Sequence, residues 1–254
     1  MTPAAPASDD SGLTMFQAVP EVDPSDSVMN GILADLREHL PESALVGGAP
    51  AENIDLQDAL DRWFPVIVGI ILVLGFLLLL IALRAPLTAL VGTVVSLLST
   101  GAAFGVARLI FQDGHLSGLL GFEPQGFLDG WGPVFFFAMI FAVAMDYTVF
   151  LLATVKEHRE RTGDATTAVT EGMAHSGRII FAAAAVMVAV FFTFALAEPL
   201  PPKEMGVILG VAVLLDALLV RLVLLPALML LAGEAAWWCP AWLRRILPDI
   251  SFSH

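Results

Sequence analysis

Five long apolar segments constrain this chain more than any other feature of its sequence. Each is close to the roughly 20 apolar residues that a helix needs to cross a bilayer. Hydrophobic residues make up 57% of the 254-residue chain and charged residues 15%, well below the roughly 25% of soluble domains. We therefore expect a mainly α-helical, polytopic membrane bundle. Its five transmembrane helices are expected at residues 64–83, 87–111, 131–154, 179–197 and 205–231.

The segment before the first apolar run, residues 1–62, is strongly acidic. It carries twelve acidic side chains and only two basic ones, Arg37 and Arg62, and it supplies most of the formal net charge of −13. Such a surface repels the phosphate backbone of a nucleic acid. Nucleic acid is therefore excluded as a partner.

Residues 1–62 also show a short mixed pattern of secondary structure. Strands are predicted at residues 13–19 and 44–48, and helical spacing predicts a helix at residues 28–40, capped by residues 23–27. One helix and two short strands bury too little surface to form a core alone. We expect a small, partial α+β segment that belongs to a larger domain or docks on a partner.

Basic residues in the short loops predict the orientation of the spans, because such residues concentrate on the cytoplasmic side. The opposite side carries Lys203, with Arg108 near the end of a span. We expect a protein of the cell membrane, with its N-terminus outside and its C-terminus in the cytoplasm. The basic residues on the expected cytoplasmic side are Arg84, Lys156, Arg159, Arg161, Arg178, Arg244 and Arg245.

Two cytoplasmic segments are expected to lie at the membrane surface. Asp164 is an N-cap candidate for a short interfacial helix before the fourth span. After the membrane domain, residues 63–232, a tail of residues 233–254 places three tryptophans beside two arginines. Tryptophan at headgroup depth next to basic side chains is typical of a segment that lies on the interface.

The third apolar run contains one acid, Asp146, followed by Tyr147, the only tyrosine of the chain. A carboxylate at the centre of a span costs about 2.5–3.5 kcal/mol on insertion scales, so it is a functional-site hypothesis. Asp146 and Tyr147 are candidates for a proton relay, and a structural polar contact between helices is the alternative. Three hydroxyl residues, Ser96, Ser99 and Thr100, are candidates for the surroundings of Asp146.

The last run contains a second acid and a base, Asp216 and Arg221, five residues apart. In an α-helix, residues four apart face each other better than residues five apart. The two side chains therefore have two interpretations. They form a structural pair, or Asp216 faces Asp146 across the bundle and takes part in the relay.

Catalytic and metal-binding patterns are missing from the sequence. The one cysteine, Cys239, has no companions for a metal cluster, and no nucleophile triad or phosphate-binding loop is present. An aspartyl intramembrane protease needs a GxGD motif, whereas AVAM precedes Asp146 and AVLL precedes Asp216. We expect no enzyme, no metal and no cofactor.

From Pro41 onward the chain resembles the C-terminal part of an actinobacterial MMPL-type transporter of the RND superfamily. The matching motifs are AMDYTVFLL, GVILGVAVLLDALLVRLVLLPALMLL, RAP between the first two spans and ALVGGAPAENIDLQDAL before them. Residues 15–40 also resemble the end of the second extracytoplasmic, porter-like domain of that family. The chain corresponds to the last five of twelve spans.

The resemblance implies export of lipids or other hydrophobic compounds, driven by the proton-motive force. It assigns the proton relay to Asp146 and Tyr147. A full member has two similar halves, so the expected partners besides the bilayer and a hydrophobic substrate are the missing N-terminal half or further copies of this chain. The alternative function is a non-transporting membrane scaffold, an accessory protein or a decayed transporter fragment.

Overall fold

A computed structural model describes residues 5–6, 14–19, 22, 28–41, 43–115, 117–121 and 132–248 of the chain. The chain divides into two compact units, Met1–Asp61 and Arg62–His254. The boundary between them falls inside one long helix, α2 (Ala49–Leu83).

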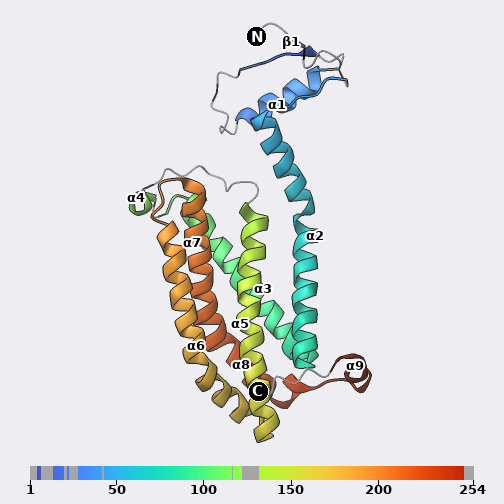
Figure 1. Cartoon of the computed structure of the whole chain (residues 1–254), viewed down its shortest axis with the longest axis vertical. Helices are drawn as coiled ribbons and strands as arrows, with labels where there is room; N and C mark the ends of the chain where they lie inside the picture. Colours follow the sequence, from blue (N-terminus) through green and yellow to red (C-terminus); the bar gives the residue numbers. More distant parts are fainter. Residues whose placement is uncertain are drawn as a thin grey trace. The chain divides into compact units, whose positions relative to one another are not determined.

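Five helices in the described part of the chain are long and apolar enough to span a membrane. This confirms the prediction of a polytopic, mainly α-helical bundle. Figure 1 shows them running side by side in the second unit. The spans are built from α2, α3 (Pro86–Ala107) with η1 (Arg108–Gln112), α5 (Gly132–Thr162), α6 (Ala165–Phe194), and α7 (Leu200–Leu215) with η2 (Asp216–Leu224) and α8 (Leu225–Ala232). A four-residue helix, α4 (Ser117–Leu120), follows η1.

The fourth span begins earlier than the sequence suggested. Asp164 is the N-cap, and its carboxylate accepts a hydrogen bond of 2.7 Å from the backbone N–H of Thr167. This bond holds the pKa of Asp164 below its usual value, because it stabilises the charged form. The helix that starts there is α6 itself, which continues without a break to Phe194. The expected separate interfacial helix is therefore wrong.

The first unit contains less sheet than predicted. A two-residue strand, β1 (Ala5–Pro6), pairs with β2 (Thr14–Met15), and residues 44–47 form no strand. The α+β prediction for this segment is not supported, because these short stretches find no longer partner strand among the described residues. The predicted cap at residues 23–27 lies outside the described residues.

One helix, α1 (Val28–His39), organises the described part of the first unit. Met29 and Leu33 of α1 are buried against Ala51 at the start of α2. Arg37 forms an ion pair of 2.7 Å with Asp55. Both side chains are exposed, so this pair contributes little stability.

Close packing of α6 on α7 depends on one glycine, Gly206. A Cβ atom at Gly206 would lie 2.6 Å from the backbone nitrogen of Ala195 and 2.6 Å from the carbonyl oxygen of Phe191. Backbone atoms cannot yield as a flexible side chain does, so only glycine fits. Gly101 on α3 is the opposite case, since a Cβ atom there would have no neighbour within 4 Å and the residue is exposed.

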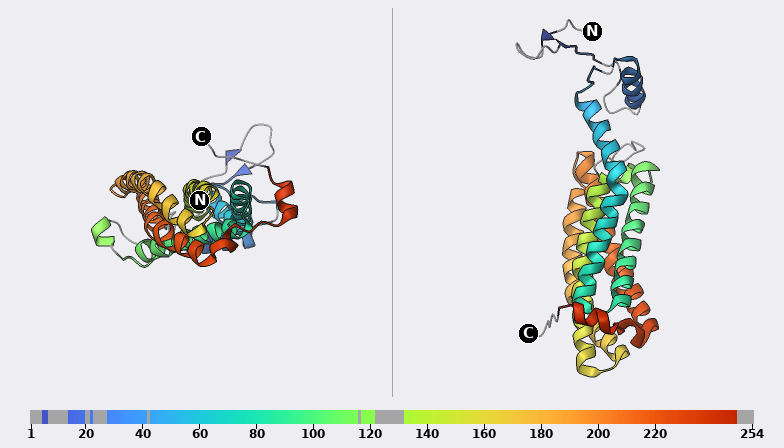
Figure 2. Two further views of the ribbon diagram at one scale, coloured as in Figure 1. Left: turned by 90° about the horizontal axis from the view of Figure 1, so that it is seen from below. Right: turned by 90° about the vertical axis from the view of Figure 1, so that its right-hand side faces the viewer.

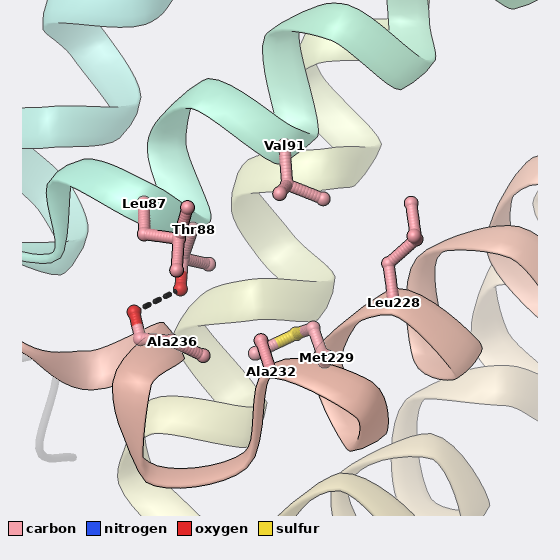
Figure 3. A pocket seen from close by; sticks show the side chains of 7 residues that line it. All are labelled: Leu87, Thr88, Val91, Leu228, Met229, Ala232 and Ala236. Atoms are coloured by element: carbon pink, nitrogen blue, oxygen red, sulfur yellow. Dashed lines mark hydrogen bonds between the residues drawn. The ribbon is translucent and has the colours of Figure 1, made fainter.

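The tail folds back on one end of the bundle. It contains a 3-10 turn, η3 (Gly233–Trp237), and a short helix, α9 (Ala241–Ile246). The Thr88 hydroxyl at the start of α3 donates a hydrogen bond of 2.5 Å to the carbonyl of Ala236, next to a small pocket between α3 and α8 (Figure 3). Glu234 accepts a 2.6 Å hydrogen bond from Arg159 of α5 and one of 3.3 Å from the backbone N–H of Ala165.

Replacing Gly206 by alanine should lower the stability of the bundle, because the added methyl group forces α6 and α7 apart. Overpacking of this kind costs about 1–3 kcal/mol. The matched control is Gly101→Ala, which should be neutral or slightly stabilising, since it fills open space on an exposed helix face. Thermal unfolding of both variants in detergent measures the difference. Equal midpoints would contradict the packing assigned to Gly206.

Candidate functional site

The last span changes its winding at Asp216, the acid that the sequence analysis singled out. From Asp216 to Leu224 the chain forms a π-helix, η2. A π-helix closes its hydrogen bonds between residues i and i+5, so residues five apart come to lie one above the other. Asp216 and Arg221 have this spacing. In the π-helix, a spacing of five residues therefore brings the two side chains to the same face of the span, where they can pair directly.

Asp216 and Arg221 form a buried ion pair. The Nε atom of Arg221 donates a hydrogen bond of 2.6 Å to Oδ2 of Asp216, and Nη2 donates to the same oxygen. The two residues are only 4% and 1% exposed. Charges removed from water in this way need a partner, because breaking one side of a buried pair costs about 3–5 kcal/mol.

Arg221 also connects the last span to the third and, through Tyr147, to the fourth. Its Nη2 atom donates a hydrogen bond of 2.9 Å to the carbonyl of Ala144 on α5. Its guanidinium carbon lies 4.6 Å from the ring centroid of Tyr147, which is cation–π distance. The Tyr147 hydroxyl in turn contacts the sulfur of Met187 on α6 at 3.0 Å. One guanidinium thus holds together a polar cluster formed by Tyr147, Asp216 and Arg221.

Asp146 is not part of this cluster. Its side chain is exposed on the outer face of α5, as are Ala142 and Phe150 one helical turn before and after it. Among the described residues, none forms a hydrogen bond or an ion pair with Asp146. The structure therefore brings Tyr147, Asp216 and Arg221 together and directs the neighbouring carboxylate away from the five helices.

The three hydroxyl residues of α3 do not surround Asp146 either. Thr100 donates to the carbonyl of Ser96 in its own helix. The hydroxyl oxygens of Ser96 and Ser99 are buried without a partner in the described protein. That prediction is wrong, because these side chains point into the bundle whereas Asp146 points out of it.

A small cavity adjoins the buried pair. It has a volume of about 10 Å³, close to the space that one water molecule needs, and Asp216 lines it together with Ile140, Val143, Ala144, Ala212 and Val213. The second carboxylate oxygen of Asp216, Oδ1, and Nη1 of Arg221 have no partner in the described protein. Buried polar atoms of this kind are usually hydrated. The pair is therefore suited to exchange hydrogen bonds with water inside the membrane domain.

Sequence reasoning missed two members of the site. Met187 gives no signal because it is one apolar residue in an apolar span, and the Ala144 carbonyl gives none because every residue has such a group. The π-helix left only an indirect signal, since an acid and a base five residues apart in an otherwise apolar run pair more easily if the winding changes. No group of three or more metal-ligating side chains occurs in the part of the chain that the structure describes.

Comparison with known proteins places the chain in a family. The sequence model of the MMPL family matches residues 23–249. The heme uptake protein MmpL11 of Mycobacterium tuberculosis H37Rv is 38% identical over 97% of this chain and 26% of its own length. The mycolic acid-containing lipids exporter MmpL11 of Mycolicibacterium smegmatis is 36% identical over 96% of this chain and 26% of its own length.

A third relative has the same pattern of coverage. The trehalose monomycolate exporter MmpL3 of M. tuberculosis CDC 1551 is 34% identical over 87% of this chain and 24% of its own length. The chain thus spans about a quarter of the length of these relatives. These relatives are named for uptake and export and not for an enzymatic reaction. Since the family match runs over most of the sequence and includes the polar cluster, this five-span membrane protein belongs to the MMPL family.

Proposed function

We propose that this chain is the C-terminal half-fragment of a proton-motive-force-driven MMPL exporter of lipids or other hydrophobic compounds. The observation that carries the proposal is the outward-facing carboxylate of Asp146, located within an apolar span. Such a group does not stably face lipid and needs protein or water against it. A partner that covers this face of α5 would supply that environment.

The length of the relatives favours the missing N-terminal half as that partner. They are about four times as long as this chain, so they contain further segments that can pack against α5. A second copy of this chain is the other candidate, because it would bring another Asp146 to the same interface. In either case the covered face lies beside Tyr147.

In the proposed relay, Asp146 takes up and releases protons at the covered interface. Tyr147 connects this interface to the interior, since its ring lies against Arg221. A proton that reached the free oxygen of Asp216 would neutralise that acid and weaken its hold on Arg221. The guanidinium would then shift its contacts with Ala144 and Tyr147. Proton occupancy is thereby linked to the packing of α5 against the last span.

The substrate class follows from the relatives. Two are named for export of mycolic acid-containing lipids and trehalose monomycolate, and a third for uptake of heme. All three compounds are largely hydrophobic. We propose a hydrophobic or lipid substrate for the assembled transporter.

The proposal includes an orientation of the chain in the membrane. The basic residues near the α2–α3 and α5–α6 turns favour a cytoplasmic location for these turns and for the tail. The first unit would then lie outside the cell membrane.

Replacing Asp146 by asparagine should abolish proton-coupled export by the assembled transporter, because the amide cannot exchange the proton. The matched control is Glu160→Gln, which makes the same change at an exposed acid near the end of the same helix. Substrate efflux driven by a pH gradient, measured at equal protein levels, compares the two. If Asp146→Asn exports normally, Asp146 is not a relay residue and a scaffold function gains support.

A second experiment separates the structural role of the buried pair from a relay role. Arg221→Met alone should destabilise the protein by about 3–5 kcal/mol, because it leaves Asp216 buried without its partner. The double variant Asp216→Leu with Arg221→Met should recover most of this loss in thermal unfolding. We expect export to remain abolished in the stable double variant. Recovery of export would limit the pair to a structural role.

Orientation can be tested with single cysteines in a Cys239→Ser background, because Cys239 is the one cysteine of the chain. A membrane-impermeant maleimide should label Arg161→Cys, an exposed position near the end of α5, in inside-out vesicles and not in intact cells. Asp113→Cys on the opposite side should give the reverse pattern. Labelling of Arg161→Cys from outside would contradict the proposed topology.

A further inference from the structure

The tail after the last span is held against the bundle by hydrogen bonds. Figure 2 shows it running across the lower end of the bundle, transverse to the spanning helices. Arg84, in the turn between α2 and α3, fixes it by donating hydrogen bonds of 2.7 Å and 2.9 Å to the carbonyls of Leu247 and Pro248. Arg84 itself has a φ of 52°, a left-handed conformation that is uncommon outside glycine. These two bonds help to hold that conformation.

The short helix of the tail, α9, is apolar on two faces. Leu243 and Leu247, four residues apart, pack against the core cluster of the bundle. Trp242 and Ile246, also four residues apart, lie on another face and are 64% and 71% exposed. Trp238 just before the helix is 65% exposed. The first face is covered by this protein, and the second requires another apolar environment.

Charge indicates what covers the exposed face. Arg244 and Arg245 are exposed beside these apolar side chains, and neither forms an ion pair with any residue that the structure describes. By contrast, Arg159 at the same end is paired with Glu234. Two guanidinium groups that have no acidic partner in the described part of the chain, next to tryptophan, fit a surface with anionic headgroups above an apolar layer.

We propose that residues 238–246 dock on anionic phospholipid headgroups at this end of the bundle. Trp238, Trp242 and Ile246 insert at the boundary between headgroups and acyl chains, and Arg244 and Arg245 bind lipid phosphates. A transverse segment with this composition is suited to lie in the plane of the interface. The proposal does not depend on transport, since it concerns only the tail and the bilayer.

The depth of the tail can be measured by quenching of tryptophan fluorescence. The full chain is reconstituted in vesicles that contain lipids brominated near the headgroup or deep in the acyl chain. The difference between wild type and Trp238→Phe/Trp242→Phe isolates these two reporters from the other three tryptophans. We expect quenching by the shallow bromines and protection from aqueous iodide. Quenching by iodide with no effect of brominated lipid would overturn the proposal.

Lipid charge is tested with brominated phosphatidylglycerol diluted into phosphatidylcholine. A basic residue close to an anionic surface contributes about fivefold in affinity, so Arg244→Gln/Arg245→Gln should weaken the preference for phosphatidylglycerol by about 30-fold at low salt. The matched control, Arg161→Gln/Arg178→Gln, removes two exposed arginines from outside the tail and should retain the preference. An equal loss of the preference for phosphatidylglycerol in the control would overturn the proposal. Protection of the tryptophans from iodide that appears only when an N-terminal half is co-expressed would also overturn it, because a protein and not lipid would then cover them.

Discussion

The buried ion pair between Asp216 and Arg221 is the interaction on which the membrane domain depends most. Desolvation of two charges is expensive, and their mutual attraction offsets it only when the geometry is good and the remaining polar atoms find partners. Here the π-helix supplies the geometry, and Ala144 and Tyr147 supply further contacts for the guanidinium. The contact of the last span with α5 therefore runs through one buried guanidinium. An apolar pair of the same size would fill the space but would not form the hydrogen bond to the Ala144 carbonyl.

Asp146 and Asp216 both lie in apolar spans, but their surroundings differ. One acid is paired with Arg221 inside the five helices, whereas the other faces away from them within an apolar span. Among the described residues, Asp216 has an ionic partner and Asp146 has none. Tyr147 follows Asp146 directly in the sequence but contacts the interior side, where its ring lies against Arg221. The arrangement agrees with a family in which relatives are about four times as long.

The parts of the structure that sequence predicted are those set by composition over long stretches. Five spans follow from the length of apolar runs, and the Asp164 cap follows from local hydrogen bonding. The contact of Asp216 with Arg221 was only one of two interpretations, because an α-helix separates residues five apart by about 140° around its axis and the π-helix was not predicted. The outward direction of the Asp146 side chain could not be predicted either. The α5 sequence is apolar on nearly all sides, so it does not indicate which face packs against the other helices. The predicted strand at residues 44–48 failed because a strand depends on a distant partner, unlike a helix.

The last span is fastened at both ends. Near its beginning the Gly206 backbone is in direct contact with that of α6, and near its end Ala236 and Glu234 are tied to α3, α5 and α6. We expect these contacts to oppose sliding or tilting of the span as a rigid body. A rearrangement of Asp216 and Arg221 between them would then require a local change of helical winding. A shift of the i+5 hydrogen bonds along the span would rotate Arg221 away from Asp216 while both ends stay in place, so we expect the wide turn to act as a torsional element between two fixed contacts.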